Sequence, residues 1–341
     1  MTTSLSNTFK FANYDEAQEY YQVNGLTDGL PIVPPTEAKV STMLGGAGLN
    51  PSDVVAVEGM RGKTFLAETV AVNAVMAGCK PEYMPVVVAA VQAVSEPQFN
   101  LHANSTSTNG VGLLVLVSGP IAKDIGINSG TVLMGHGYRA NATIGRAMSL
   151  LKVNAYGSVP HDMDKSTFGH AGQYTFCFAE DDDVIPWEPL RVEKGFSVDA
   201  ATVTVFAANS PLQVSTHNYS QPTEFLGIVS DAIQGMGMGS SEIVVVISPE
   251  ILEYVRSSGW NKARIKDFIF KNIHRTGSEW NASFRTDHPF SGDDLTGGFP
   301  VVDSPDHITL VGGGGAAGAF VSIIGAWGGV SSVTKEISIR R

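Results

Sequence analysis

Apolar runs alternate with turns rich in glycine and proline along most of the chain. The continuous run Val111 to Val117 predicts a strand buried on both faces, as in a covered parallel sheet. Tyr174 to Ala179 alternates larger and smaller residues with the two-residue period of a strand. Pro81 to Val94 is apolar nearly all round, which predicts a buried helix. These patterns together predict an α/β fold.

Residues 71–88 predict two helices that meet at a tight corner. The first runs roughly from Thr64 to Ala77 and ends at Gly78, since glycine best tolerates a left-handed helix terminus. The second begins at Pro81, which is favoured in a first turn because it has no N–H group to leave unpaired. Cys79 lies between the two helices.

Residues 81–126 and 222–259 follow the same plan of helix, turn, apolar strand, Ser-(Gly)-Pro, short helix and glycine. This weak repeat predicts two similar α/β lobes, with mostly parallel or mixed sheets covered by helices. We expect a helix and an extended arm over residues 1–50, a first lobe over 51–190, and a second lobe over 191–341. The active site is expected in the crevice between the lobes.

The arm from Leu26 to Thr36 has too many glycines and prolines for a helix or a central strand. Its apolar Leu30, Ile32 and Val33 predict packing on the body or on a neighbouring subunit, with a turn at Asp28 and Gly29. Together with the low fraction of charged residues, 16%, the arm predicts a homo-oligomer, with a dimer as the first expectation.

Charge and cysteine content narrow the classes of function. The net charge of −11 argues against a nucleic-acid partner, which needs basic patches. Two cysteines without a CxxC spacing argue against a disulfide scaffold or zinc cluster. The sequence shows no signal peptide and no apolar run long enough to span a membrane. We therefore expect a cytoplasmic protein without a membrane partner.

Cys79 is the first candidate for chemistry. It precedes a helix N-terminus and is followed by Lys80, and both features favour a thiolate. Glu82 and Tyr83, in the first turn, are candidates to orient or protonate a substrate, or to cap the helix. The competing interpretation is a small apolar residue that fills a helix corner.

Other polar residues give further candidates. Arg139 and Arg146 lie seven residues apart and predict either a buried ion pair or a clamp for a carboxylate. Near them are three candidate substrate-binding residues of the same loop system, Asn128, Ser129 and Asn141. His102 and His170 are auxiliary candidates in polar loops. No histidine spacing indicates a metal site.

Gly313, Gly315 and Gly318 formally match the glycine fingerprint of dinucleotide-binding proteins. Too few residues follow for the rest of that unit, so we interpret the segment as a glycine turn that leads into an apolar helix. Its backbone N–H groups either bind a carboxylate or phosphate, or the glycines allow close helix packing.

Several long strings resemble a family of largely uncharacterised bacterial proteins. They include LTDGLPIVPPT, NAVMAGCKPEYMPVVVAAVQA, GPIAKDIGINSG, RANATIGRA and YTFCFAEDDD with PWEPL. Relatives of that family include the UGSC-motif (seleno)proteins, named for a selenocysteine/cysteine-Gly-Ser-Cys signature. This chain has no Cys-Gly-Ser-Cys. The resemblance therefore implies Cys79 as a candidate thiol, and cooperation with a separate thiol or selenol protein.

The sequence predicts an enzyme for a small, carboxylate-bearing organic molecule, with Cys79 as nucleophile or acid/base and Glu82 or Tyr83 as its proton partner. The sequence does not distinguish between thiol-dependent redox, lyase and hydrolase chemistry, and it does not identify a cofactor. The alternative is a non-catalytic ligand-binding or scaffold subunit that works with a separate thiol or selenol protein.

Overall fold

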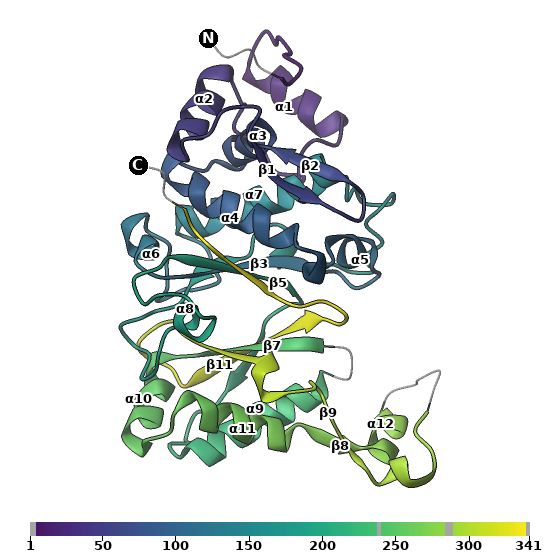
Figure 1. Cartoon of the computed structure of the whole chain (residues 1–341), viewed down its shortest axis with the longest axis vertical. Helices are drawn as coiled ribbons and strands as arrows, with labels where there is room; N and C mark the ends of the chain where they lie inside the picture. The colour runs from purple at the N-terminus through teal and green to yellow at the C-terminus, as the bar shows by residue number, and fades with distance from the viewer. Residues whose placement is uncertain (1–4, 237–239, 284–288, 339–341) are drawn as a thin grey trace. The chain divides into compact units, whose positions relative to one another are not determined.

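The computed structural model describes residues 5–236, 240–283 and 289–338. Helices and strands alternate through both of its compact units, so the predicted α/β class is confirmed (Figure 1). The first unit comprises residues 1–180, 191–210 and 330–341, and the second comprises 181–190 and 211–329. Each unit is built from separate stretches of chain, whereas the predicted lobes are continuous in sequence.

Strand β3 (Gly112–Ser118) organises the first unit, and every one of its residues is buried. It pairs in parallel with β4 (Cys177–Ala179) and antiparallel with β5 (Thr202–Ala208), and β5 pairs antiparallel with β12 (Val333–Glu336). A separate hairpin joins β1 (Val54–Glu58) and β2 (Lys63–Leu66). The predicted buried strand is therefore present, in a sheet that is mixed.

Two helices pack on the β3–β5 sheet, α4 (Met84–Val94) and α7 (Arg139–Leu151), and α3 (Ala67–Ala77) packs on α7 (Figure 1). Nine of the eleven residues of α4 are buried, as expected of a helix that is apolar nearly all round. The remaining helices of the unit are short or peripheral: α1 (Tyr14–Val23), α2 (Glu37–Gly46), α5 (Leu101–Thr106), α6 (Ile121–Asp124) and α8 (Leu190–Glu193).

The helix corner forms largely as predicted. Helix α3 ends at Gly78, whose φ of 92° is left-handed, and Pro81 opens a 3₁₀ turn (Pro81–Tyr83) that runs into α4. The first helix begins at Ala67 instead of Thr64, because Lys63–Leu66 forms strand β2. Thr64 and Phe65 are good strand formers, and pairing with β1 overrides the helical pattern there.

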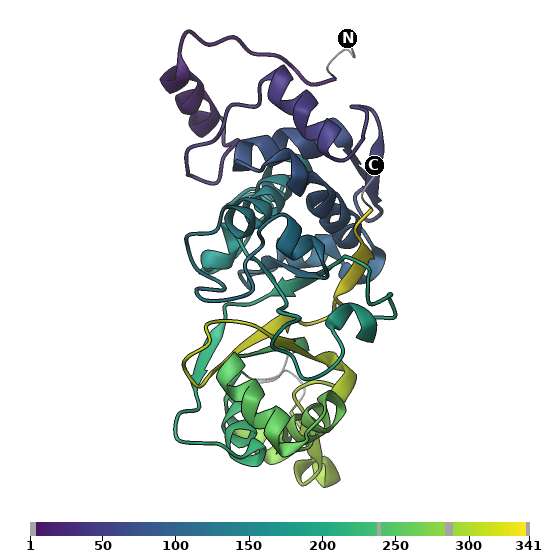
Figure 2. The ribbon, with the colours of Figure 1, turned by 90° about the vertical axis from the view of Figure 1, so that its left-hand side faces the viewer.

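The second unit contains four paired strands in the order β10 (Ile308–Gly312), β7 (Ser240–Ile247), β11 (Phe320–Trp327) and β6 (Leu212–Ser215). Its helices α9 (Pro222–Gly235), α10 (Pro249–Ser258) and α11 (Lys262–Asn272) lie together on one side of these strands (Figure 2). A small hairpin, β8 (His274–Thr276) with β9 (Gly298–Pro300), and helix α12 (Gly277–Ser283) complete the unit.

The two stretches with a common sequence plan share an order of elements. Helix α4, strand β3 and helix α6 precede Gly126, and helix α9, strand β7 and helix α10 precede Gly259. Both glycines have a left-handed φ, 72° and 68°. The first stretch differs by an inserted helix α5, where the sequence predicted a polar loop over residues 102–110.

The N-terminal arm packs on its own unit. Ile32 is only 2% exposed, and the Gln18 amide group both donates to and accepts from its backbone. The Val33 N–H donates to the Met76 carbonyl of α3. Leu30 and Val33 are half exposed, so the arm buries one of its three large apolar side chains. A homo-oligomer stays a prediction.

Candidate functional site

A cavity of about 410 Å³ opens in the first unit where helix α7 ends. Its walls are the beginning of β3, the last turn of α7, the loop over residues 158–174, and the arm. The polar side chains among its lining residues are Asp28, Ser149, Lys152, Ser158, Asp164, His170, Gln173 and Tyr174. We call this cavity the Lys152 pocket. It lies within the 300–1,000 Å³ range typical of sites for small molecules.

Lys152 is the cation of this pocket. The part of the chain that the structure describes gives its Nζ one hydrogen bond, a long one of 3.5 Å to the Val111 carbonyl. Burial lowers the pKa of Lys152, and attraction to Asp164 opposes part of that shift. A lysine held this way loses its proton more readily than an exposed lysine, the usual preparation of a lysine for acid/base or nucleophilic chemistry.

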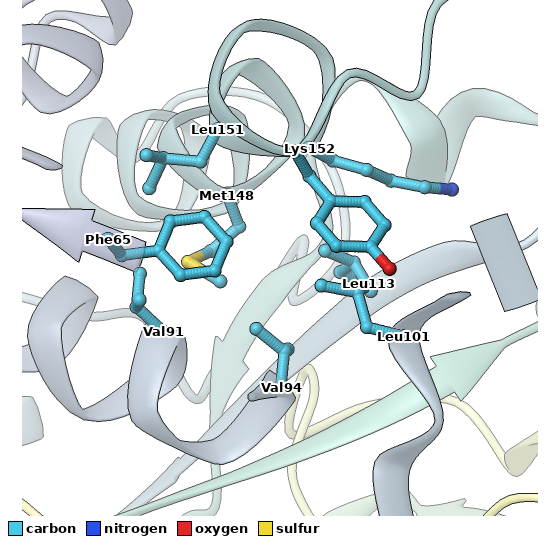
Figure 3. Close-up of a pocket in the computed structure, with 9 residues that line it drawn as sticks. Phe65, Val91, Val94, Leu101, Leu113, Met148, Leu151 and Lys152 are labelled. Atoms are coloured by element: carbon cyan, nitrogen blue, oxygen red, sulfur yellow. The ribbon is translucent and has the colours of Figure 1, made fainter. Parts of the chain in front are cut away.

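The last turn of α7 explains how Lys152 reaches the pocket. Residues Lys152–Tyr156 form a π-helical turn that ends at Gly157, with φ 89°. The methylene stem of Lys152 lines a small apolar cavity of about 10 Å³ together with Leu113, Met148 and Leu151. Figure 3 shows the side chain leaving that apolar group, with its nitrogen at the far end. Core packing therefore fixes the stem while the amine faces a polar space.

Asp164 supplies the negative charge near Lys152. Its Oδ1 accepts hydrogen bonds from the Ser166 N–H, at 2.9 Å, and from the Ser166 hydroxyl, at 2.5 Å. These bonds fix the carboxylate on the loop opposite the end of α7. An amine and a carboxylate lining one cavity form a pair that can exchange a proton.

His170 also lines the pocket, but both of its ring nitrogens are occupied. Nδ1 accepts from the Gly172 N–H at 3.1 Å, so Nε2 carries the proton and donates to the Ala208 carbonyl at 3.1 Å. Burial lowers the pKa of His170, although the hydrogen bond to Ala208 acts the other way. His170 was predicted as an auxiliary catalytic residue, but its bonds identify it as a neutral part of the wall.

Arg146 forms the ion pair that the sequence left open as one of two interpretations. Its Nε and Nη2 donate to the two oxygens of Asp28 at 2.7 and 2.8 Å. Nη2 also donates to the Leu30 and Pro31 carbonyls. The guanidinium hydrogen bonds and charge hold the pKa of Asp28 below its usual range, although burial acts the other way. Arg146 thus fastens the arm as a wall of the pocket.

Glycines allow the loop to close against β3. A Cβ atom on Gly112 would lie 2.8 Å from the Gly172 carbonyl oxygen and 3.0 Å from His170 Cε1. A Cβ on Gly110 would collide with the backbone of Gly169. These glycines, together with Lys152 and Asp164, are residues of the pocket that were not predicted from the sequence. The available signal was a lysine at the end of an apolar helix face, opposite a glycine-rich loop.

The environment of Cys79 differs from the prediction. The side chain is 7% exposed, and its Sγ donates to the Thr143 carbonyl at 3.2 Å. Burial raises the pKa of Cys79 to about 12, so the expectation of a favoured thiolate is wrong. Desolvation outweighs the nearby helix terminus. Cys177 is also buried with a raised pKa, and both thiols are protonated at neutral pH.

The neighbours of Cys79 have structural contacts of their own. Glu82 pairs with Lys80 on the surface at 3.4 Å, whereas Tyr83 is buried at 3% exposure. Arg139 donates from Nε and Nη2 to the Gly78 carbonyl, at 3.1 and 2.9 Å, and so stabilises the end of α3. His102 lies in helix α5, not in the predicted loop.

Asn128 and Asn141 lie together, as predicted, and bind each other. Asn141 Oδ1 accepts from the Asn128 N–H at 2.8 Å, and its Nδ2 donates to the Asn128 carbonyl at 3.1 Å. Asn128 Oδ1 caps the turn after Ser129 by accepting from the Gly130 N–H. None of Asn128, Ser129 and Asn141 lines the Lys152 pocket.

The glycine segment at 313–318 lies in the second unit and leads into strand β11, so the predicted helix is wrong there. Phe320, Val321 and the isoleucines that follow favour a strand, and pairing with β7 and β6 provides the partners. The Gly313 N–H donates to the Ile247 carbonyl. The Gly318 N–H donates to Glu250 at 2.7 Å, so this turn binds a carboxylate of its own chain. Gly315 belongs to the same turn.

Among residues 5–236, 240–283 and 289–338, no helix is long and apolar enough to cross a membrane, and no three potential metal-binding side chains group together. No protein-family model matches the sequence, and neither does any curated protein.

Proposed function

We propose that this protein is an enzyme acting on a small, carboxylate-bearing organic molecule, with the Lys152 pocket as its active site. The observation that carries the proposal is the Lys152 amine, which faces a cavity of about 410 Å³ and forms one long hydrogen bond within the described part of the chain. A structural lysine in a folded interior is normally satisfied by several acceptors or by a close counter-ion.

Charge favours an anionic ligand. Of the two carboxylates among the lining residues, Asp28 is already neutralised by Arg146. Asp164 keeps its charge, but its hydrogen bonds go to Ser166 and it forms no ion pair with Lys152 within the described residues. Lys152 is partly buried, and a cation withdrawn from water is costly unless it is paired. A ligand carboxylate would supply Lys152 with the counter-ion and the hydrogen-bond acceptors that its surroundings provide only in part.

The lowered pKa of Lys152 favours catalysis over binding alone. An amine that loses its proton easily can accept a proton from a bound molecule and return it later. We assign the exchange of that proton to Asp164, which lines the same cavity and attracts the charge of Lys152. This pair takes the acid/base roles that the sequence analysis gave to Cys79, Glu82 and Tyr83.

A non-catalytic ligand-binding subunit is the second candidate function, and one observation favours it. Both thiols of this chain are buried with raised pKa values, so thiol chemistry would have to come from another protein. The sequence resemblance to UGSC-related proteins points the same way, with a separate thiol or selenol protein as partner.

A panel of small hydroxy, oxo and amino acids tests the proposal. NMR measures whether each acid binds to the protein and whether it is converted. Wild-type protein is compared with Lys152→Met and with Lys165→Met. Lys165 is a matched control because it is exposed on the pocket loop and donates only to the His161 carbonyl within the described structure.

We expect at least one acid to bind and be converted by wild type and by Lys165→Met, and not by Lys152→Met. Binding without turnover, both with and without an added thiol protein, contradicts the proposal that this protein is an enzyme. Turnover only when the thiol protein is added supports the second candidate function, a ligand-binding subunit. Equal binding and turnover by Lys152→Met would place the active site elsewhere.

A further inference from the structure

We infer that Lys152 forms a covalent imine with its substrate, and that the substrate class is a carboxylic acid with an aldehyde or ketone carbon close to the carboxylate. This inference rests on the proposed function and specifies the chemistry of the same site. It makes Lys152 a nucleophile as well as a proton carrier.

The placement of the amine is the first reason. An imine requires the lysine nitrogen to approach a carbonyl carbon along a defined direction, so the lysine stem must be held still. The stem of Lys152 lines a small apolar cavity together with Leu113, Met148 and Leu151, which restricts its movement, and the π-helical turn that begins at Lys152 sets where the side chain leaves the helix. Such turns are common at functional sites.

The second reason is that the amine is partly buried and uncommitted. Its single hydrogen bond in the described structure, 3.5 Å to Val111, is at the limit of a useful interaction. Partial burial that disfavours the ammonium form is a recognised way to activate a lysine toward carbonyl groups. A lysine that served only as a cationic anchor would gain from the opposite environment, which keeps its proton.

Asp164 provides the acid/base partner that imine formation needs. The Lys152 ammonium first gives a proton to the Asp164 carboxylate, and the free amine then adds to the carbonyl carbon. The nitrogen loses a proton and the former carbonyl oxygen gains one, which gives a neutral carbinolamine. The Asp164 carboxyl group then protonates the hydroxyl, which leaves as water. The products are a protonated imine, one water molecule and the original Asp164 carboxylate, so atoms and charges balance.

The other lining residues do not compete for these roles. His170 has both ring nitrogens bound to the backbone, and Asp28 is held by two hydrogen bonds from Arg146. Among the charged groups that line the pocket, the uncommitted amine is therefore Lys152, and the carboxylate that acts on its charge is Asp164.

Borohydride trapping tests the inference. Full-length protein is incubated with pyruvate, glyoxylate or a longer oxo acid and then reduced, and the modified peptide is identified by mass spectrometry. We expect a mass increase equal to the oxo acid less one oxygen atom, located on Lys152. The matching hydroxy acid, which lacks the carbonyl group, should bind and leave no adduct.

Three variants sharpen the test. Lys165→Met should be trapped as wild type, and Lys152→Arg, which keeps the charge, should give no adduct. Asp164→Asn keeps an oxygen for the Ser166 bonds but loses the charge, and we expect its trapping rate to fall about 100-fold, the scale of general acid–base catalysis.

The outcomes separate this inference from the proposed function. An oxo acid that binds in a Lys152-dependent manner but leaves no adduct overturns the imine and leaves the site intact. Adduct formation at Lys165 and Lys152 to the same extent shows random reductive amination and also overturns it. If no acid of the panel binds, the proposed function itself fails.

Discussion

Replacement of Arg146 by Met is expected to destabilise the first unit and to free the arm from the pocket. The Arg146 and Asp28 side chains are only 15% and 8% exposed, so the substitution leaves a carboxylate nearly buried without its partner. Loss of one partner of a buried pair costs about 3–5 kcal/mol. The remaining exposure screens part of this effect, so we expect about 3 kcal/mol of lost unfolding free energy, near the lower limit.

A double-mutant cycle isolates the pair from the other contacts of Arg146. Asp28→Asn, Arg146→Met and the double variant are unfolded in urea and followed by circular dichroism. We expect a coupling energy of about 1.5–3 kcal/mol, as for hydrogen bonds to charged groups. Lys80→Met serves as the control, because the Lys80–Glu82 pair is about half exposed and such pairs contribute at most about 1 kcal/mol.

The pH dependence of the coupling follows from the lowered pKa of Asp28. The pair stabilises the fold fully above the ordinary pKa of 3.8, and this contribution is lost as the pH falls through the lower pKa of the folded state. A coupling energy below about 0.5 kcal/mol at neutral pH, as for an exposed pair, would refute the reasoning, as would a coupling that persists after Asp28 is protonated.

Three further predictions concern single residues. Cys79 should react with iodoacetamide at neutral pH far more slowly than free cysteine, because the thiol is buried and its pKa is raised. Cys79→Ala should keep any activity of the protein. Rapid alkylation of the folded protein would contradict the burial and raised pKa of Cys79. Gly112→Ala should lower the unfolding free energy by about 1–3 kcal/mol through overpacking. The control Gly45→Ala, whose new Cβ meets open space on helix α2, should leave the unfolding free energy unchanged or raise it. Urea unfolding measures both variants, and equal effects would contradict the close approach of the loop to Gly112. Phe168 lines the pocket yet is 97% exposed. Phe168→Ala should therefore weaken the binding of an accepted acid about tenfold, or about 1.4 kcal/mol, as measured by calorimetry, and should leave the stability of the fold unchanged. Unchanged affinity would show that the ring does not belong to the site.

Much of the fold follows from local patterns in the sequence. The apolar run at 111–117, the all-apolar helix after Pro81 and the left-handed glycines at 78 and 259 each produced the expected element, because burial and backbone freedom decide these positions locally. The segment after Gly318 became a strand instead of a helix. Its partners β6 and β7 are distant in sequence, and the choice between helix and strand in a short apolar run depends on such partners.

The site could be predicted only in part. His170 and Arg146 were identified from their positions, but their roles depend on carbonyl and carboxylate groups from other segments of the chain. Cys79 carries every local signal of a reactive thiol, and burial by residues far away in sequence reverses the expected shift of its pKa. Lys152 shows no motif, and only the fold brings Asp164 and the loop to its amine.

The titration of the Lys152 amine tests the central claim most directly. Wild-type protein is acetylated by a brief pulse of acetic anhydride across a range of pH, and the modification of each lysine is read by peptide mass spectrometry. The account predicts that the midpoint for Lys152 lies clearly below that of the exposed Lys165, and that a bound carboxylate protects Lys152 while Lys165 reacts as before. A Lys152 midpoint equal to or above that of Lys165 would contradict an activated amine, and with it the proposed active site.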